Sequence, residues 1–148
     1  INLQGDEPFF NPKDLKKIIT YSSKNPNEII NGYSDIKDEK LFRNPSIPKV
    51  ILNKKDYLIY MSRAAIPTTK KKEFKKAWRQ ICVYSFPRKV LLKMKRIKKT
   101  PIENIEDIEI LNFIEEGYKV KMLKLSNSSL AIDTPQDLKA ANKLLRNN

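Results

Sequence analysis

Segments with helical periodicity alternate with strand-like segments along this 148-residue chain. Asn11 and Pro12 are typical of a helix start, with Asn as the N-cap and Pro in the first turn. The apolar residues Leu15, Ile18 and Ile19 then follow at the spacing of one helical face. Alternation of this kind restricts the chain to an α/β domain, because each strand must share a sheet that the helices cover.

The strand-like segments are rich in β-branched and aromatic residues and are bounded by turn-forming residues. They span residues 1–4, 49–52, 57–61, 78–86 and 118–125. Residues 53–56 separate two of these segments at the distance of a hairpin. Residues 22–46 are polar and turn-rich, so we expect a loop with short helical pieces there.

Further helices are predicted after Pro87 and over residues 103–116, where Gly117 is placed as the C-cap. A last helix is expected to open at Thr134 and Pro135. The pattern as a whole predicts a mixed sheet flanked by helices.

The predicted domain spans residues 1–148, with a β element inserted at about residues 47–86. The basic residues 68–76 are expected to form a mobile excursion from the sheet.

The sequence has no His and a single cysteine, Cys82. The lack of imidazole excludes Ser–His and Cys–His catalysis and zinc sites built on His. A lone cysteine allows no internal disulfide, which favours a reducing compartment such as the cytoplasm. Because Cys82 lies between Ile81 and Val83, we expect a small buried apolar side chain there.

Neither a membrane span nor a signal peptide is predicted. No apolar run approaches the ~20 residues that a spanning helix needs. The chain begins at Ile1 without an initiator Met or a basic leader, so we expect that an upstream segment has been removed.

The net charge of +13 is concentrated in residues 70–76 and 88–99. One hypothesis is therefore a non-catalytic basic module that binds nucleic acid or an acidic partner. The aromatic residues are not interleaved with the basic runs, and no nucleic-acid-binding module is recognisable. Anionic substrates or a solvated basic face explain the charge better.

Two acidic positions are candidate metal ligands. Asp6 and Glu7 follow a strand directly after Gly5, and the carboxyl ends of strands are where open α/β sheets bind ligands. Hard oxygen ligands at such a place suit Mg²⁺, although an ordinary turn is the alternative. Asp133 precedes the last helix, where Thr134 can serve as the N-cap and leave Asp133 for another role.

Arg63 follows Ser62 at the end of a predicted strand, where a guanidinium could clamp a carboxylate or simply lie on the surface. A helix face with several carboxylates is more typical of a solvated surface than of a catalytic one. Such a face is expected at Glu103, Glu106, Glu109 and Glu116.

Several blocks in order resemble one family. These blocks are Gln4-Gly5-Asp6-Glu7-Pro8, Tyr60-Met61-Ser62-Arg63-Ala64-Ala65-Ile66-Pro67, Ile81-Cys82-Val83-Tyr84, Ile102-Glu103-Asn104-Ile105-Glu106-Asp107-Ile108-Glu109 and Ile132-Asp133-Thr134-Pro135-Gln136-Asp137-Leu138. They resemble, over essentially the whole chain, the cytidylyltransferases that make CMP-3-deoxy-manno-octulosonate (CMP-KDO).

The resemblance implies a nucleotide-diphospho-sugar transferase fold and a Mg²⁺-dependent transfer of CMP from CTP to a 3-deoxy-octulosonate. It also implies a homodimer formed largely through the inserted segment, a role in lipopolysaccharide or capsule synthesis, and neither a membrane nor a specific nucleic acid as partner. Asp6 and Asp133 take the place of the family's catalytic metal ligands. The substrate-binding positions that it implies are Gln4, Arg63, Gln80, Tyr84, Glu106 and Glu109.

Within that set Arg63 would hold the sugar carboxylate, while Tyr84 and Gln80 would contact sugar hydroxyls. The chain departs from the family at Gln80, where His is usual, and at Ile110, where Gln is usual. Both positions are expected to line the sugar side. The family's N-terminal portion, which holds CTP, is missing, so we expect this chain alone to be incomplete and inactive.

The charge generates the first prediction. We expect weak binding to DNA or RNA that is independent of sequence and lost at physiological salt, because lysine runs without stacking aromatics act through counterion release. Fluorescence anisotropy with mixed-sequence oligonucleotides at low and physiological salt measures this. Tight binding that survives physiological salt would support the basic-module hypothesis.

Overall fold

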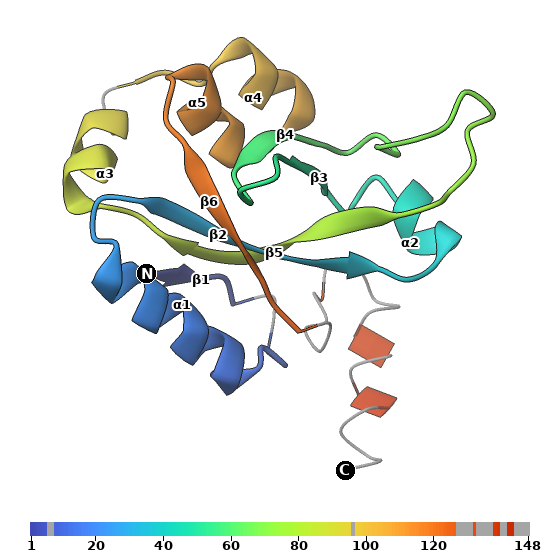
Figure 1. Cartoon of the computed structure of the whole chain (residues 1–148), viewed down its shortest axis with the longest axis horizontal. Helices are drawn as coiled ribbons and strands as arrows, with labels where there is room; N and C mark the ends of the chain where they lie inside the picture. The colour runs from blue at the N-terminus through green and yellow to red at the C-terminus, as the bar shows by residue number, and fades with distance from the viewer. Residues whose placement is uncertain (6–7, 96, 127–131, 133–137, 140–141, 144–148) are drawn as a thin grey trace.

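The computed structural model describes residues 1–5, 8–95, 97–126, 132, 138–139 and 142–143. A six-stranded mixed sheet lies at its centre, with helices on both faces (Figure 1). The strands are β1 (Asn2–Leu3), β2 (Ile29–Ile36), β3 (Lys49–Leu52), β4 (Leu58–Ser62), β5 (Ala77–Ser85) and β6 (Val120–Lys124). Their order is β4-β3-β5-β2-β6, and β1 pairs with β5. The predicted mixed α/β class is confirmed.

Strand β5 organises the sheet. β2 runs antiparallel to it along one edge, from Ile30 opposite Ser85 to Ile36 opposite Ala77. Because β2 occupies that edge, β1 and β3 share the other one. The predicted hairpin is confirmed as the antiparallel pair β3–β4. Residues 47–86 thus include β5 itself, while their predicted part in dimerisation stays a prediction.

The prediction of a loop over residues 22–46 is wrong at β2, which pairs antiparallel with β5 and parallel with β6. Its sequence includes Asn31, Gly32, Ser34 and Asp35, all of low strand propensity. Nearly every residue of β2 is buried, so the alternation of polar and apolar residues that marks a half-exposed strand is missing.

Helix α1 (Pro12–Lys24) begins where the sequence predicts, with the Lys13 amide donating to Asn11 Oδ1 at 2.9 Å. Ile18 is fully buried against the sheet, but Ile19 is 45% exposed. The predicted apolar face is therefore too wide, because α1 contacts the sheet along a narrower line than its sequence suggests. α2 (Glu39–Arg43) follows β2, and α3 (Arg88–Met94) begins after Pro87 as predicted.

The single helix predicted over residues 103–116 is two helices, α4 (Pro101–Glu106) and α5 (Ile110–Glu115). Asp107 separates them in a left-handed conformation, with φ of 51°, which Asp tolerates better than most residues do. The break turns α5 against the face of the sheet opposite α1 (Figure 1). Among the described residues, no helix is long and apolar enough to cross a membrane.

Each face of the sheet has its own apolar core. On the α1 face, Ile18 packs with Ile30, Ile81 and Val83. The larger core on the α4–α5 face includes Leu111 and other buried residues of β2, β4 and β6. The sheet curls around that core, because the turn before β4 reaches β6.

At that closure the amide of Met122 donates to Asp56 O at 2.8 Å, and Lys121 Nζ donates to Lys55 O at 2.6 Å. These bonds hold the hairpin tip to a strand at the other end of the sheet order.

The core on the α1 face leaves no room for a side chain at Gly32. A Cβ at this position would lie 2.5 Å from Leu125 Cδ1 and 3.0 Å from Val83 Cγ1, so Gly32→Ala should cost about 1–3 kcal/mol of unfolding free energy through overpacking. Equilibrium urea unfolding measures the change. Gly5→Ala is the matched control, because a Cβ there meets nothing within 4 Å. Equal stabilities of the two variants would contradict the prediction.

Candidate functional site

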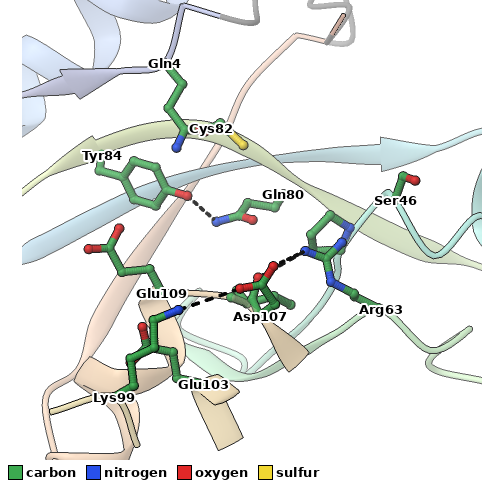
Figure 2. Close-up of a pocket in the computed structure, with 12 residues that line it drawn as sticks. Gln4, Ser46, Arg63, Gln80, Cys82, Tyr84, Lys99, Glu103, Asp107 and Glu109 are labelled. Carbon is green, nitrogen blue, oxygen red and sulfur yellow. Dashed lines mark hydrogen bonds and ion pairs between the residues drawn. The ribbon is translucent and has the colours of Figure 1, made fainter. Parts of the chain in front are cut away.

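A cavity of about 430 Å³ opens at the edge of β5, between the points where β1 and β3 pair with it (Figure 2). On the β1 side the Gln4 amide donates to Cys82 O at 3.3 Å. On the β3 side the Gln80 amide donates to Pro48 O at 3.0 Å. The cavity therefore lies where two short segments share one strand edge.

The floor of the cavity is formed by Gln80, Cys82 and Tyr84, which share one face of β5 because side chains alternate along a strand. Gln80 Nε2 donates to the Tyr84 hydroxyl at 2.8 Å. Burial, followed by the nearby Cys82, raises the pKa of Tyr84 well above its ordinary value. Tyr84 is thus a neutral phenol around neutral pH, and it offers the floor an uncharged polar group beside Gln80.

The walls of the cavity carry charges of both signs. Arg63 and Lys99 are cationic, whereas Glu103, Asp107 and Glu109 are anionic. Asp107 lies 3.9 Å from Arg63 and 3.8 Å from Lys99, at exposed positions where such pairs are weak. A ligand that carries both a carboxylate and hydroxyl groups would find a partner for each.

Arg63 is held in place by backbone oxygens. Its Nε donates to Glu106 O at 2.7 Å, and its two terminal nitrogens donate to Pro45 O at 3.1 Å and Asp107 O at 3.0 Å. These bonds fix the plane of the guanidinium without using all its N–H groups. The remaining donors are available to an anion in the cavity.

The Glu106 carboxylate in turn binds the segment that carries Arg63. It accepts from Ser62 Oγ at 2.6 Å, from the Arg63 amide at 2.9 Å and from Tyr60 Oη at 3.1 Å. Burial alone would raise the pKa of Glu106, but these hydrogen bonds and the Arg63 charge lower it below its ordinary value. Glu106 does not line the cavity, so the geometry makes it a support for Arg63.

Lys49 lies beside the backbone of Arg63 and is fully buried. Its Nζ donates to Asn44 O at 2.9 Å and to Arg63 O at 2.6 Å. Burial, with the nearby Arg63 charge, lowers the pKa of Lys49 to about 8. The sequence gives no signal for this residue, because a lysine at the start of a strand is normally exposed.

Of the predicted substrate-binding residues, the structure brings Gln4, Arg63, Gln80, Tyr84 and Glu109 to one cavity. Their roles there stay predictions. Asp6 and Asp133 lie outside the described residues. In the described part of the chain, no group of three His, Cys, Asp or Glu side chains could hold a metal ion. The predicted role of these two aspartates as Mg²⁺ ligands stays a prediction.

Three expectations need correction. Ile110 is 1% exposed and packs in the apolar core rather than lining the cavity, because α5 turns this side chain toward the sheet. Glu103 is buried rather than solvated, since Asn112 Nδ2 donates to it at 2.5 Å. Cys82 is only half-buried and lines the cavity. Sequence reasoning also missed Lys99, which is one of many lysines in a basic run.

Comparison with known proteins places this geometry in context. The protein-family model described as cytidylyltransferase matches residues 1–124. The chain is 35% identical to the 3-deoxy-manno-octulosonate cytidylyltransferase of Christiangramia forsetii, over 98% of this chain and 60% of that protein. It is 30% identical to the protein of the same name from Fusobacterium nucleatum, over 100% of this chain and 61% of that protein. The chain thus spans about 60% of the length of these relatives.

Solved structures share the fold. A structure of CMP:2-keto-3-deoxy-manno-octonic acid synthetase complexed with CTP matches with a TM-score of 0.88 at 24% identity, covering 99% of this chain and 61% of that chain. The 4-diphosphocytidyl-2C-methyl-D-erythritolsynthase of Anaerococcus prevotii matches with a TM-score of 0.57 at 18% identity, covering 97% of this chain and 57% of that chain. At these identities the likeness concerns the fold alone.

The Glu106 contacts predict an acid-sensitive contribution to stability. Because its pKa is lower in the folded state than in the unfolded state, the contribution is complete above about pH 4.5 and is lost as pH falls through the lowered pKa. Glu106→Gln should therefore cost about 1–2 kcal/mol near neutral pH, and less at about pH 3. Urea unfolding across this range measures the difference.

Glu116→Gln is the matched control, since it makes the same charge change at an exposed position. A Glu106→Gln variant whose deficit relative to the wild type does not shrink on acidification would contradict the assignment.

Proposed function

The chain belongs to the cytidylyltransferase family, and on that premise we propose that the protein it forms part of transfers CMP from CTP to a 3-deoxy-octulosonate. In this reaction the oxygen of the sugar's anomeric hydroxyl attacks the α-phosphorus of CTP. The bond between the α-phosphorus and the oxygen bridging to the β-phosphate breaks, pyrophosphate leaves, and the hydroxyl proton is released. The product would serve lipopolysaccharide or capsule synthesis.

The observation that carries this proposal is the mixed polarity of the cavity at the edge of β5. A sugar acid needs a cation for its carboxylate and acceptors for its hydroxyls. Arg63 supplies a fixed guanidinium, whose planar donors suit a carboxylate. Glu109 and Gln80 supply acceptors on other sides of the same space. The names of the relatives point to the same class of substrate.

Positioning would be the chief contribution of the described residues. Arg63 would fix the sugar through its carboxylate, and Tyr84 and Gln80 would set the rotation of the ring through its hydroxyls. Orientation of this kind converts bound groups into a reactive pair and supplies much of the barrier reduction in phosphoryl transfer. Gln4 lines the cavity two residues before Asp6, so the sugar would lie close to the segment that carries the first aspartate.

Mg²⁺ is proposed as the cofactor. Asp6 and Asp133 are the carboxylates that would hold it, and the ion would supply charge neutralisation at the phosphates. This part of the proposal rests on the residue types in the Gln4–Pro8 and Ile132–Leu138 segments, which match the family pattern.

A homodimer in the cytoplasm is proposed as well. The outer strand β4 leaves Ile59 53% exposed, which suits burial against a second copy. The single cysteine suits a reducing compartment. The alternative of a basic binding module is not favoured by any feature of the cavity.

The test is pyrophosphate release by the full-length protein with CTP, Mg²⁺ and 3-deoxy-manno-octulosonate. We expect activity that EDTA abolishes, and a loss of at least about 100-fold in kcat for Asp6→Asn and for Asp133→Asn, because each removes a charged metal ligand. Asp38→Asn is the matched control, since it makes the same change at the N-cap of α2, where Asn serves equally well. Aspartate variants as active as this control would refute the metal assignment.

A further inference from the structure

An irregularity in the pairing of β2 with β5 creates a buried polar contact behind the cavity. Asn31 pairs with Tyr84, but the next residue, Gly32, pairs with Ile81. At this register shift the side chain of Asn31 lies beside the carbonyl groups of Ile81 and Val83. Asn31, which is fully buried, donates from Nδ2 to Ile81 O at 3.0 Å and to Val83 O at 2.9 Å.

These two bonds determine which way the Asn31 amide faces. A carbonyl oxygen can only accept a hydrogen bond, so the Asn31 atom that contacts both carbonyls must be the nitrogen. Both hydrogens of Nδ2 are then used, and Oδ1 is left as a pure acceptor. Reversing the amide would place an oxygen against two oxygens in a buried space, which is strongly unfavourable.

The orientation passes from Asn31 to Gln80. Gln80 Nε2 lies 3.2 Å from Asn31 Oδ1 and 2.8 Å from the Tyr84 hydroxyl. Because Asn31 Oδ1 requires a donor, the Gln80 atom facing it must be the amide nitrogen. Its two hydrogens are committed to Asn31 and Tyr84. Gln80 Oε1 is then the atom of this amide left to a ligand.

The position of Gln80 makes this orientation matter. Gln80 is 6% exposed, lines the cavity, and is turned with its nitrogen toward Tyr84 and its oxygen away from it (Figure 2). Among the described residues, Oε1 of Gln80 has no recorded donor. A ligand group that fills the space beside it must therefore donate a hydrogen bond, or leave a buried acceptor unpaired.

We propose that Asn31 is a positioning residue that makes Gln80 a hydrogen-bond acceptor only, so that the site selects a sugar acid presenting a donor, a hydroxyl or an amino group, at this point. The inference rests on the proposed function and adds a specificity determinant to it. Asn31 does not line the cavity and acts through Gln80. A fluorine is similar in size to a hydroxyl but cannot donate a hydrogen bond. Replacing a hydroxyl by fluorine therefore weakens binding if Gln80 is fixed with Oε1 toward the ligand, but not if its amide can turn and present Nε2.

The experiment compares kcat/KM of the full-length protein for 3-deoxy-manno-octulosonate and for analogues in which each hydroxyl not used in the reaction is replaced in turn by fluorine. In the wild type, one analogue should lose about 10- to 100-fold, the effect of an unpaired buried acceptor. Asn31→Leu, which keeps the approximate size but not the amide, should reduce the loss for that analogue to within about threefold, because Gln80 can then turn its nitrogen to the fluorine.

Ser34→Ala is the matched control. Ser34 lies on β2 as well, is fully buried, and its hydroxyl has no hydrogen-bond partner among the described residues, so the change removes a buried polar atom without touching Gln80. It should keep the hydroxyl-to-fluorine ratio of the wild type. Gln80→Met is a second variant should Asn31→Leu fail to fold. Gln80→Met should lower kcat/KM for the parent sugar acid but not for the fluorine analogue, so that the two substrates are no longer distinguished.

The Gln80 side-chain amide provides a readout that does not need turnover. In ¹⁵N NMR of the full-length protein, its two hydrogens should exchange slowly with solvent in the wild type and in Ser34→Ala, and quickly in Asn31→Leu. Rapid exchange in the wild type, or a fluorine penalty that survives Asn31→Leu or Gln80→Met, would overturn the inference. Slow exchange without any transfer to the parent sugar acid would instead refute the proposed function while confirming the network.

Discussion

The reciprocal contact between Arg63 and Glu106 is the interaction on which the rest of the site depends. The carboxylate of Glu106 holds the chain as it leaves β4, and the guanidinium of Arg63 holds the end of α4. Both groups are only partly buried, and their hydrogen bonds compensate for the contact with water that each has lost. Together they join the hairpin to the helical layer and give the cavity a wall of fixed charge.

The sheet explains why a cavity exists at this place. Most strands of a sheet have neighbours along their full length, but one edge of β5 is shared by two short segments. Side chains on that stretch of β5 can face a ligand while their backbone remains tied to β2. Polar residues such as Gln80 are tolerated there because Asn31 and Tyr84 satisfy them. The irregular pairing of β2 with β5 thus places Asn31 where it can accept a hydrogen bond from Gln80.

The sequence predicts those parts of the structure that local chemistry determines. The cap at Asn11 and the β3–β4 hairpin follow from signals within a few residues. β2 could not be predicted, because its polar residues become a strand only when β5 and β6 flank it. The same holds for Lys49, whose burial depends on the backbone of Arg63 at the end of the neighbouring strand β4. Resemblance supplied the candidate residues of the cavity, whereas Asn31 acts behind it and matches no motif.

The floor of the cavity has a consequence for how the site responds to acidity. A histidine changes its charge near neutral pH, so a sugar contact made by an imidazole varies with the pH of the cell. Gln80 has no proton to gain or lose in that range, and burial moves the ionisation of Tyr84 further from it. Contacts that a ligand makes with these two side chains are therefore insulated from changes of pH around neutrality.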